Sequence, residues 1–223
     1  MIRSTLRTTV RQLLGETTAS FWSDAMLNQW IEDGQLDIVW RTKCKRTTNL
    51  CDTTASTLTY RLSTLVPNIL RIADGGIRIY DSTEVKWEKL APKTKDWLDQ
   101  NYRGWELAPE GIPLYYVASV ELDELIIYPV AESDCVGVDY LKIEALIKPI
   151  AITSDSNSPD LPTTLHLALI DYVVATGLAS RGYADIADKS WSQYYAKIKS
   201  YMIERDYDED TQEIIMRPNY RGR

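Results

Sequence analysis

The sequence predicts an α+β fold in which an antiparallel β-domain is inserted between two pairs of helices. Apolar residues recur at three- and four-residue steps near both ends of the chain and alternate with polar residues in its middle. An isolated helix pair cannot cover its apolar face, so the two pairs are expected to form one four-helix bundle. The expected parts are a helical hairpin at 1–46, a β-sandwich or barrel-like domain at 47–152, a helix pair at 153–205 and an extended tail at 206–223.

The first helix is indicated by an apolar stripe near the N-terminus. Ser4 is a candidate N-cap, and Gly15 stands where the helix would end in a left-handed residue. The stripe consists of Leu6, Val10, Leu13 and Leu14.

The second helix has the sharpest start in the chain. Ser23 can accept hydrogen bonds from the free N–H groups of the first turn, and Asp24 complements the positive helix end. Trp22 and Leu27 have the spacing of a hydrophobic staple. The helix is expected to end on cations that suit its C-terminus, namely Arg41, Lys43, Lys45 and Arg46.

The middle of the chain changes to a period of two. The pair Gly75-Gly76 lies between two β-runs and predicts a hairpin turn, and Pro92 predicts the start of a short helix. The turn near Asp123 joins two further strands. The expected strands lie at about 58–62, 69–72, 77–80, 115–120, 125–128 and 136–147.

A polar linker, 153–162, leads back into helix. Pro162 fits a first helical turn, and Gly182 marks a break between the two C-terminal helices. The acidic run 204–210 is expected to fray the second helix. The two apolar stripes are Leu165, Leu169, Ile170, Val173 and Gly177, then Ala187, Trp191, Tyr194, Ile198 and Met202.

Composition limits the class of partner. The 7 Trp and 14 Tyr against one Phe favour amphipathic contact surfaces, and the net charge of −7 argues against tight gripping of DNA phosphates. Cys44, Cys51 and Cys135 form no zinc or disulfide pattern, so no cofactor is expected. The sequence shows no signal peptide and no apolar run of about 20 residues, so synthesis in a cytoplasm and no membrane contact are expected.

The candidates for catalysis are weak. His166 is the only histidine, and its apolar helical neighbours favour a packed side chain over a base. Asp123 and Glu124 could form an acid/base pair, but neighbours on a strand point to opposite faces. The acidic residues of 206–210 lack the glycine and distal Glu of a calcium loop. We therefore expect no enzyme.

Two separated stretches resemble the head-to-tail connector (adaptor) proteins of tailed bacteriophages. The first has a helix ending in Leu-Gly, an F-W-S-D cap and a W-I helix that closes on R-T-K-C. The second has the form L-P-x-x-x-H-x-A-L-x-D-Y. The matching residues are Leu14, Gly15, Phe21 to Asp24, Trp30, Ile31, Gln35, Arg41 to Cys44, Leu161, Pro162, His166, Ala168, Leu169, Asp171 and Tyr172.

The resemblance implies a structural virion protein. It implies a homo-oligomeric ring of twelve copies that binds the portal protein and the tail proteins at the head-tail junction, with double-stranded DNA passing through its channel without sequence-specific binding. A tail-completion or tube protein, and a glycan hydrolase using Asp123 and Glu124, remain alternatives. The candidate residues for portal or subunit contact are Arg41, Lys43, Lys45, Arg46, Ile214, Ile215, Met216, Arg217, Tyr220 and Arg221.

Overall fold

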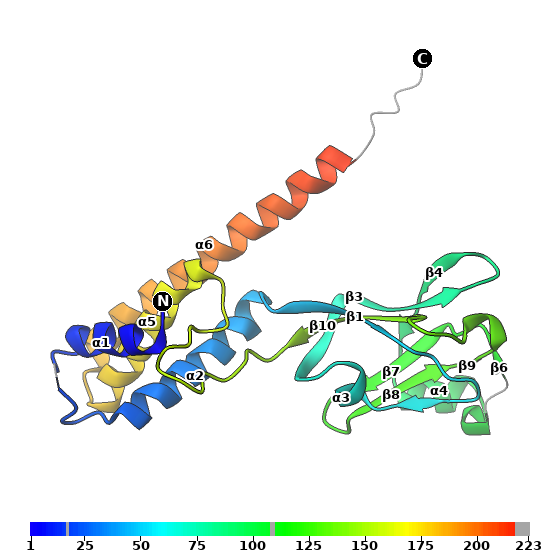
Figure 1. Ribbon diagram of the computed structural model, residues 1–223, viewed down its shortest axis with the longest axis horizontal. Helices are drawn as coiled ribbons and strands as arrows, with labels where there is room; N and C mark the ends of the chain where they lie inside the picture. The colour runs from blue at the N-terminus through cyan, green and yellow to red at the C-terminus, as the bar shows by residue number, and fades with distance from the viewer. Residues whose placement is uncertain (17, 108–109, 217–223) are drawn as a thin grey trace, which may run out of the picture. The chain divides into compact units, whose positions relative to one another are not determined.

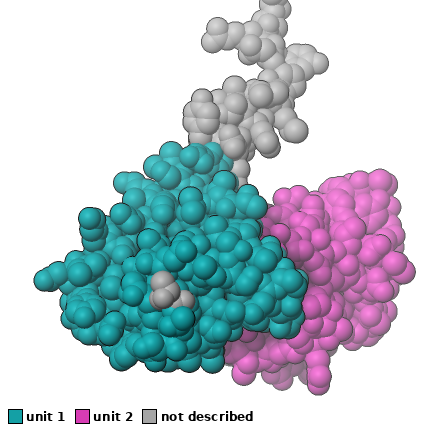
Figure 2. Space-filling view, turned by 60° about the vertical axis from the view of Figure 1, so that its left-hand side comes forward, with its two compact units in different colours: residues 1–44, 149–223 teal, residues 45–148 magenta. Residues whose placement is uncertain are grey.

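In the computed structural model the chain has a mixed α+β fold with six α-helices and several antiparallel sheet pairings (Figure 1). The structure describes residues 1–16, 18–107 and 110–216, with side chains as far as Arg205. The chain divides into two compact units, coloured separately in Figure 2. The helical unit contains residues 1–44 and 149–223, and the β unit contains residues 45–148.

The helical unit is built from four long helices drawn from both ends of the chain. Helix α5 contacts each of the other three. It is apolar along most of its length, so burial of Leu169 and Val173 stabilises the unit. The bounds are α1 Arg3–Leu13, α2 Asp24–Thr42, a 3-10 turn Thr163–Leu165, α5 His166–Ser180 and α6 Ala184–Met216.

The predicted start of α2 and end of α1 are confirmed. The Ser23 hydroxyl accepts from the Met26 N–H at 3.1 Å, and Gly15 has a φ of +73°. The Ser4 cap is wrong, because α1 begins at Arg3 with Ile2 as N-cap and no side-chain cap bond. Leu13, which belongs to the predicted apolar stripe, is exposed, whereas Val10 and Arg11 in the last turn of α1 are buried.

The C-terminal helix is longer than predicted. Helix α6 continues through the acidic run to Met216, so the extended tail and the fraying expected from Glu204 are wrong as far as that residue. No Gly or Pro lies between 184 and 216, and Glu, Gln and Met are good helix formers. The rest of the predicted tail, 217–223, lies outside the described residues.

One stretch of the described chain, Thr163–Ser180, is long and apolar enough to cross a membrane by length and composition. The sequence analysis found no such stretch. Half of the stretch is buried within the protein, and its helix contacts α1, α2 and α6. The central helix of a globular unit has the same composition, so this feature is weak support for a membrane span.

The first sheet of the β unit has four antiparallel strands in the order β1-β10-β3-β4. The sequence analysis missed β1, because it assigned Arg46 to the helix end and began its first strand only at about residue 58. Strand β1 pairs with β10 from Arg46 opposite Leu146 to Cys51 opposite Leu141. The strands are β1 Arg46–Cys51, β3 Ile69–Asp81, β4 Lys86–Lys89 and β10 Leu141–Ile147.

The second sheet has the order β2-β8-β7-β5. The predicted hairpin around Asp123 is confirmed as β7 and β8, and β5 adds a short parallel pairing to β7. A separate two-stranded sheet pairs β6 with β9. The strands are β2 Thr59–Tyr60, β5 Ala91–Pro92, β6 Glu110–Gly111, β7 Tyr115–Ser119, β8 Glu124–Tyr128 and β9 Val130–Ala131.

Alternate residues of the second sheet serve two cores. Leu125 and Ile127 of β8 join Ile79 and Ile143 of the first sheet in one buried cluster. Ile126 and Tyr128, from the other face of β8, pack with Leu98 and Trp105. Both faces of β8 are therefore buried, which explains its continuous apolar run.

The predicted hairpin at Gly75-Gly76 is wrong. Residues 69–81 form the single strand β3, and its register against β10 shifts between Ile143–Ile77 and Ala145–Ile72. The extra residues form a bulge. A Cβ atom on Gly75 would lie 1.7 Å from Glu144 Oε2, so the glycine is needed for close approach of the β10 side chain.

Other expected elements are shorter or displaced. Pro92 belongs to β5, and the helix expected there is α4, Lys95–Asn101, capped by Thr94. The strand expected from Val136 begins at Leu141, because 3-10 and bend residues precede it. The remaining short elements are α3 Leu62–Leu65, η1 Trp105–Leu107 and η2 Ser133–Cys135.

Candidate interaction surfaces

The basic segment predicted as an interface is divided between the two units. Arg41 and Lys43 belong to the helical unit, whereas Lys45 and Arg46 belong to the β unit. Lys43 ends α2 with a left-handed φ of 53°, and Arg46 is the first residue of β1. The four cations therefore do not share one helix end, as the sequence predicted, because the helix stops before Lys43.

Asp37 binds the cation that α2 carries in its last turn. The Arg41 Nε donates to Asp37 Oδ2 at 2.7 Å, and Tyr194 of α6 donates its hydroxyl to the same oxygen. The hydrogen bond to Asp37 raises the pKa of Arg41. Burial, and then the same carboxylate, raise the pKa of Tyr194. Asp37 thus pairs with Arg41 within α2 and joins the end of α2 to α6 through the charge-assisted hydrogen bond from Tyr194.

Exposed apolar and aromatic side chains lie beside this contact. Leu36 and Trp40 are neighbours on α2, four residues apart, and Trp40 is 46% exposed. The Arg41 guanidinium lies over the exposed ring of Tyr195, 5.2 Å from its centroid. We call these four residues the α2–α6 surface. Aromatic residues and Arg are enriched at protein interfaces, so this surface is suited to a protein partner.

Aromatic side chains of α5 and α6 pack against one another next to the α2–α6 surface. Tyr172 of α5 lies 5.2 Å from Trp191 in an edge-to-face arrangement, and Trp191 lies 5.8 Å from Tyr194. Such pairs contribute about 0.5–1.5 kcal/mol each beyond their buried area. The surface therefore has a rigid base and would lose little conformational entropy on binding.

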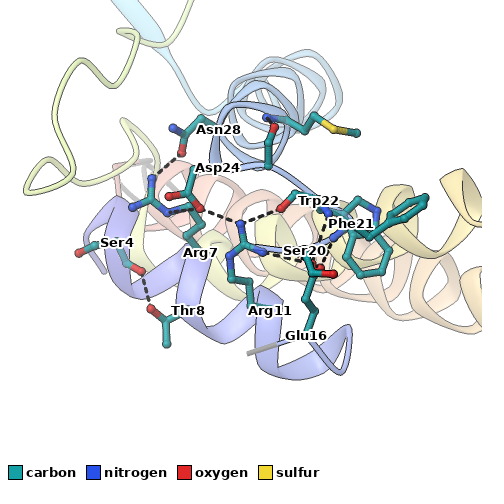
Figure 3. A network of polar contacts seen from close by, with 12 residues as sticks. Ser4, Arg7, Thr8, Arg11, Glu16, Ser20, Phe21, Trp22, Asp24 and Asn28 are labelled. Atoms are coloured by element: carbon teal, nitrogen blue, oxygen red, sulfur yellow. Dashed lines mark hydrogen bonds and ion pairs between the residues drawn. The ribbon is translucent and has the colours of Figure 1, made fainter. Parts of the chain in front are cut away.

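A buried arginine holds the connection between α1 and α2 (Figure 3). Arg11 donates to Glu16 at 3.2 Å, to the Trp22 carbonyl at 2.8 Å and to Asp24 at 2.7 Å. Glu16 in turn accepts from the backbone N–H groups of Ser20, Phe21 and Trp22. Burial opposes ionisation of Glu16, but these donors and the charge of Arg11 outweigh it and lower its pKa.

The same network positions a second group of exposed residues. Phe21 and Tyr183 are exposed, and the Arg181 guanidinium lies 4.8 Å from the Phe21 ring centroid and 6.0 Å from that of Tyr183. We call Phe21, Arg181 and Tyr183 the loop surface. The sequence analysis did not identify Arg181, because nothing near it in the sequence indicates a partner on the α1–α2 connection.

The C-terminal candidates lie at or beyond the end of α6. Ile214, Ile215 and Met216 belong to this helix, whereas Arg217, Tyr220 and Arg221 lie outside the described residues. The two groups of candidates, basic segment and C-terminus, are thus carried by different elements.

Residues 1–221 match the SU10 adaptor protein family. The chain belongs to this family. No curated protein matches the sequence. The family match covers both stretches that resemble phage connectors, so the predicted adaptor class is confirmed.

In this family member the resembling residues mostly maintain the helical unit. Leu169 and Tyr172 of α5 pack against Gly34 of α2 so closely that a Cβ atom on Gly34 would lie 2.6 Å from Leu169 Cδ1 and 2.8 Å from Tyr172 Cδ1. Gln35 is buried and accepts from the Asp160 N–H at 2.9 Å. Asp171 binds Lys197 of α6. These contacts give the motif residues a structural role within the helical unit.

The residues considered for chemistry have structural partners. His166 is buried, with Nδ1 3.1 Å from the Met1 nitrogen and Nε2 3.3 Å from the Leu161 carbonyl. Asp123 accepts from the Ser63 hydroxyl and N–H, which lowers its pKa, and Glu124 pairs with Lys95. Among the described residues no three His, Cys, Asp or Glu side chains are grouped to hold a metal ion.

Proposed function

We propose that this protein is a structural head-to-tail adaptor of a tailed phage. The observation that carries the proposal is its membership of the SU10 adaptor protein family over residues 1–221. In the virion, at the head-tail junction, copies of the chain would bind the portal protein on one side and tail proteins on the other. The role is structural, with no catalytic step. Synthesis takes place in the host cytoplasm.

The assembled form is a ring, for which the connector resemblance implies twelve copies. A ring needs two different complementary patches on each subunit. The α2–α6 surface and the loop surface are two such patches within the helical unit, both rich in aromatic residues and Arg. In this proposal the four helices act as one bundle that keeps both patches rigid, and the sandwich-like β unit is carried on it.

The predicted contact residues retain their proposed roles. Arg41 lies in the α2–α6 surface and would contact a neighbouring copy, as would Lys43, Lys45 and Arg46. The C-terminal part of α6, with Ile214, Ile215 and Met216, would dock in a groove of the portal as an apolar helix. Arg217, Tyr220 and Arg221 would continue this contact. The channel would pass double-stranded DNA without reading its sequence.

Electron microscopy of the purified chain, alone and mixed with isolated portal rings, tests the proposal. The expected result is a ring of the chain bound coaxially to the portal. Rings that bind tail tubes but not the portal would instead make the chain a tail-completion or tube protein. Lytic activity lost on substitution of Asp123 and Glu124 would make it a glycan hydrolase.

The docking part of the proposal has its own variant. Ile214→Asp with Met216→Asp should abolish portal binding and leave ring formation intact, because positions two apart cover different sides of the helix and at least one charge would be buried in the apolar groove. Gln212→Asp with Thr211→Asp adds the same charge one turn earlier as a matched control. Equal binding by both variants would remove α6 from the portal contact.

A further inference from the structure

The first sheet has one face in the core of the β unit and one outer face. Ile77, Ile79, Leu141 and Ile143 fill the core side. Residues directly opposite each other on neighbouring strands point to the same side of a sheet. The strand register therefore assigns each remaining side chain to the outer face.

A row of cations crosses this outer face. Lys142 of β10 lies opposite Leu50 of β1 on one side and Arg78 of β3 on the other, and Arg78 lies opposite Lys89 of β4. Neighbouring strands are about 4.8 Å apart, so the row Leu50-Lys142-Arg78-Lys89 spans about 14 Å.

A second row lies four residues along β10. Arg46 of β1 and Arg71 of β3 are both opposite Leu146. The distance between the two rows is about 13 Å along the strand. Two acidic residues belong to this region: Glu144, which lies against Gly75, and Asp74 at the bulge, 3.9 Å from Arg46. We call the five cations Arg46, Arg71, Arg78, Lys89 and Lys142 the basic face.

Three members of the basic face have no partner in the described part of the chain. No hydrogen bond or ion pair joins the side chains of Arg71, Arg78 or Lys142 to a described residue, and the Nε atoms of both arginines are buried and unsatisfied. Unsatisfied buried donors are uncommon in folded proteins. The terminal nitrogens of the two guanidinium groups are not among these buried atoms, so they are the atoms that a bound anion would contact.

Aromatic rings border the basic face. Tyr80 lies opposite Trp87, with ring centroids 5.4 Å apart, and 5.0 Å from the ring of Tyr140. Trp87 is 38% exposed. In sites for single-stranded nucleic acid such rings stack on bases, whereas beside a duplex they would border the cationic contact without stacking.

We propose that the basic face contacts the phosphate backbone of duplex DNA. The inference rests on the proposed function for the source of this DNA, and it assigns the residues that meet it. One strand of a duplex carries a charge every 3.4 Å or so, so a face about 13 Å long would meet about four phosphates. The contact is independent of base sequence, because it involves no base edge.

The charge distribution favours DNA over an acidic protein segment as the partner. Lysine is depleted from protein–protein interfaces, although Arg is enriched there, whereas protein–DNA interfaces are strongly positive. Lys142 and Arg78 are the two middle positions of the first row, on a chain whose net charge is −7, and Glu144 lies between the two rows. A local surface of opposite sign to the whole chain indicates a specific anionic partner.

The test measures binding of a fluorescent random-sequence duplex to the full chain between about 50 and 200 mM salt. The variant carries Arg78→Gln, Lys89→Gln and Lys142→Gln. The control carries Arg61→Gln, Lys95→Gln and Arg103→Gln, which remove three cations of the same unit away from the first sheet. We expect the variant to bind at least about 10-fold more weakly and its salt slope to fall by about 2–3, with the control near wild type.

Three results would overturn the assignment. The first is no binding by the wild type at the lowest salt, and the second is an equal loss in variant and control. The third adds to the first a loss of self-association: if no form binds DNA and the variant no longer associates with itself, the basic face contacts another copy of the chain. Ring formation on the portal is scored separately, so failure of DNA binding and failure of the adaptor proposal are distinguishable.

Discussion

Several cations of the helical unit are paired with carboxylates, whereas three of the five on the outer face of the first sheet have no ion-pair partner among the described residues. Arg3 and Arg7 of α1 both bind Asp155 at 2.8 Å, across about 150 residues of sequence. Hydrogen bonds from Arg7 and Arg3 lower the pKa of Asp155. Arg78 and Lys142 of the β unit have no such partner among the described residues. Charged side chains therefore connect distant segments in the helical unit, whereas in the β unit Arg78 and Lys142 are available for a binding partner.

The difference follows from how each unit is assembled. The helical unit is made from two ends of the chain, so side chains must join segments that no turn connects. The β unit is one continuous segment held by backbone pairing between strands. Substitutions in the helical unit should therefore change stability, and substitutions on the basic face should change binding alone.

The largest expected effect is steric separation of α2 from α5. Gly34→Val places methyl groups where Leu169 and Tyr172 already lie within 2.8 Å of a Cβ position. We expect a loss of about 3 kcal/mol in the free energy of unfolding. Urea titration followed by far-UV circular dichroism measures it. Gln29→Val, at an exposed position of α2, is the control, and equal losses would show that helix propensity is the cause.

The next effect concerns the Arg11 network of Figure 3. Arg11→Met replaces the aliphatic stem of the arginine with an apolar side chain of similar reach and removes the donors to Glu16, Asp24 and the Trp22 carbonyl. We expect destabilisation by about 2 kcal/mol, because hydrogen bonds to charged groups are lost. The same urea titration applies, with exposed Gln12→Met as control. A stability equal to wild type would mean that the network does not hold the α1–α2 connection.

A smaller effect is the pH dependence from His166. Burial, and then the positive charge of the Met1 nitrogen, lower its pKa. The associated stability is present above the unfolded pKa of about 6.5 and is lost as the pH falls through the folded value. A histidine NMR titration should show one resonance with a midpoint below that of a denatured sample. A raised midpoint would contradict the buried, neutral histidine.

The smallest expected effect on stability is on the basic face. Arg78→Gln with Lys142→Gln should leave the free energy of unfolding within about 0.5 kcal/mol of wild type, since neither side chain has an ion-pair partner among the described residues. The control is Lys95→Gln, which removes the pair with Glu124. Strong destabilisation by the double variant would make the two cations structural and would remove the contrast between the units.

The sequence by itself determined features that depend on neighbouring residues. The Ser23 cap, the left-handed Gly15, the β7–β8 hairpin and the apolar stripe of α5 each depend on contacts within a few positions. Arg41 was identified as an interface candidate in the same way, from its position at a helix end. The adaptor class followed from two short motifs.

Only the tertiary structure decided features that depend on pairing between distant segments. Gly75-Gly76 predicts a hairpin locally, but pairing with β10 keeps β3 continuous and makes the pair a bulge. The cations from Arg46 to Lys142 are scattered along the sequence, and the strand register alone assembles them into one basic face. The physical reason is that a one-residue change of register would turn each of these side chains to the other side of the sheet.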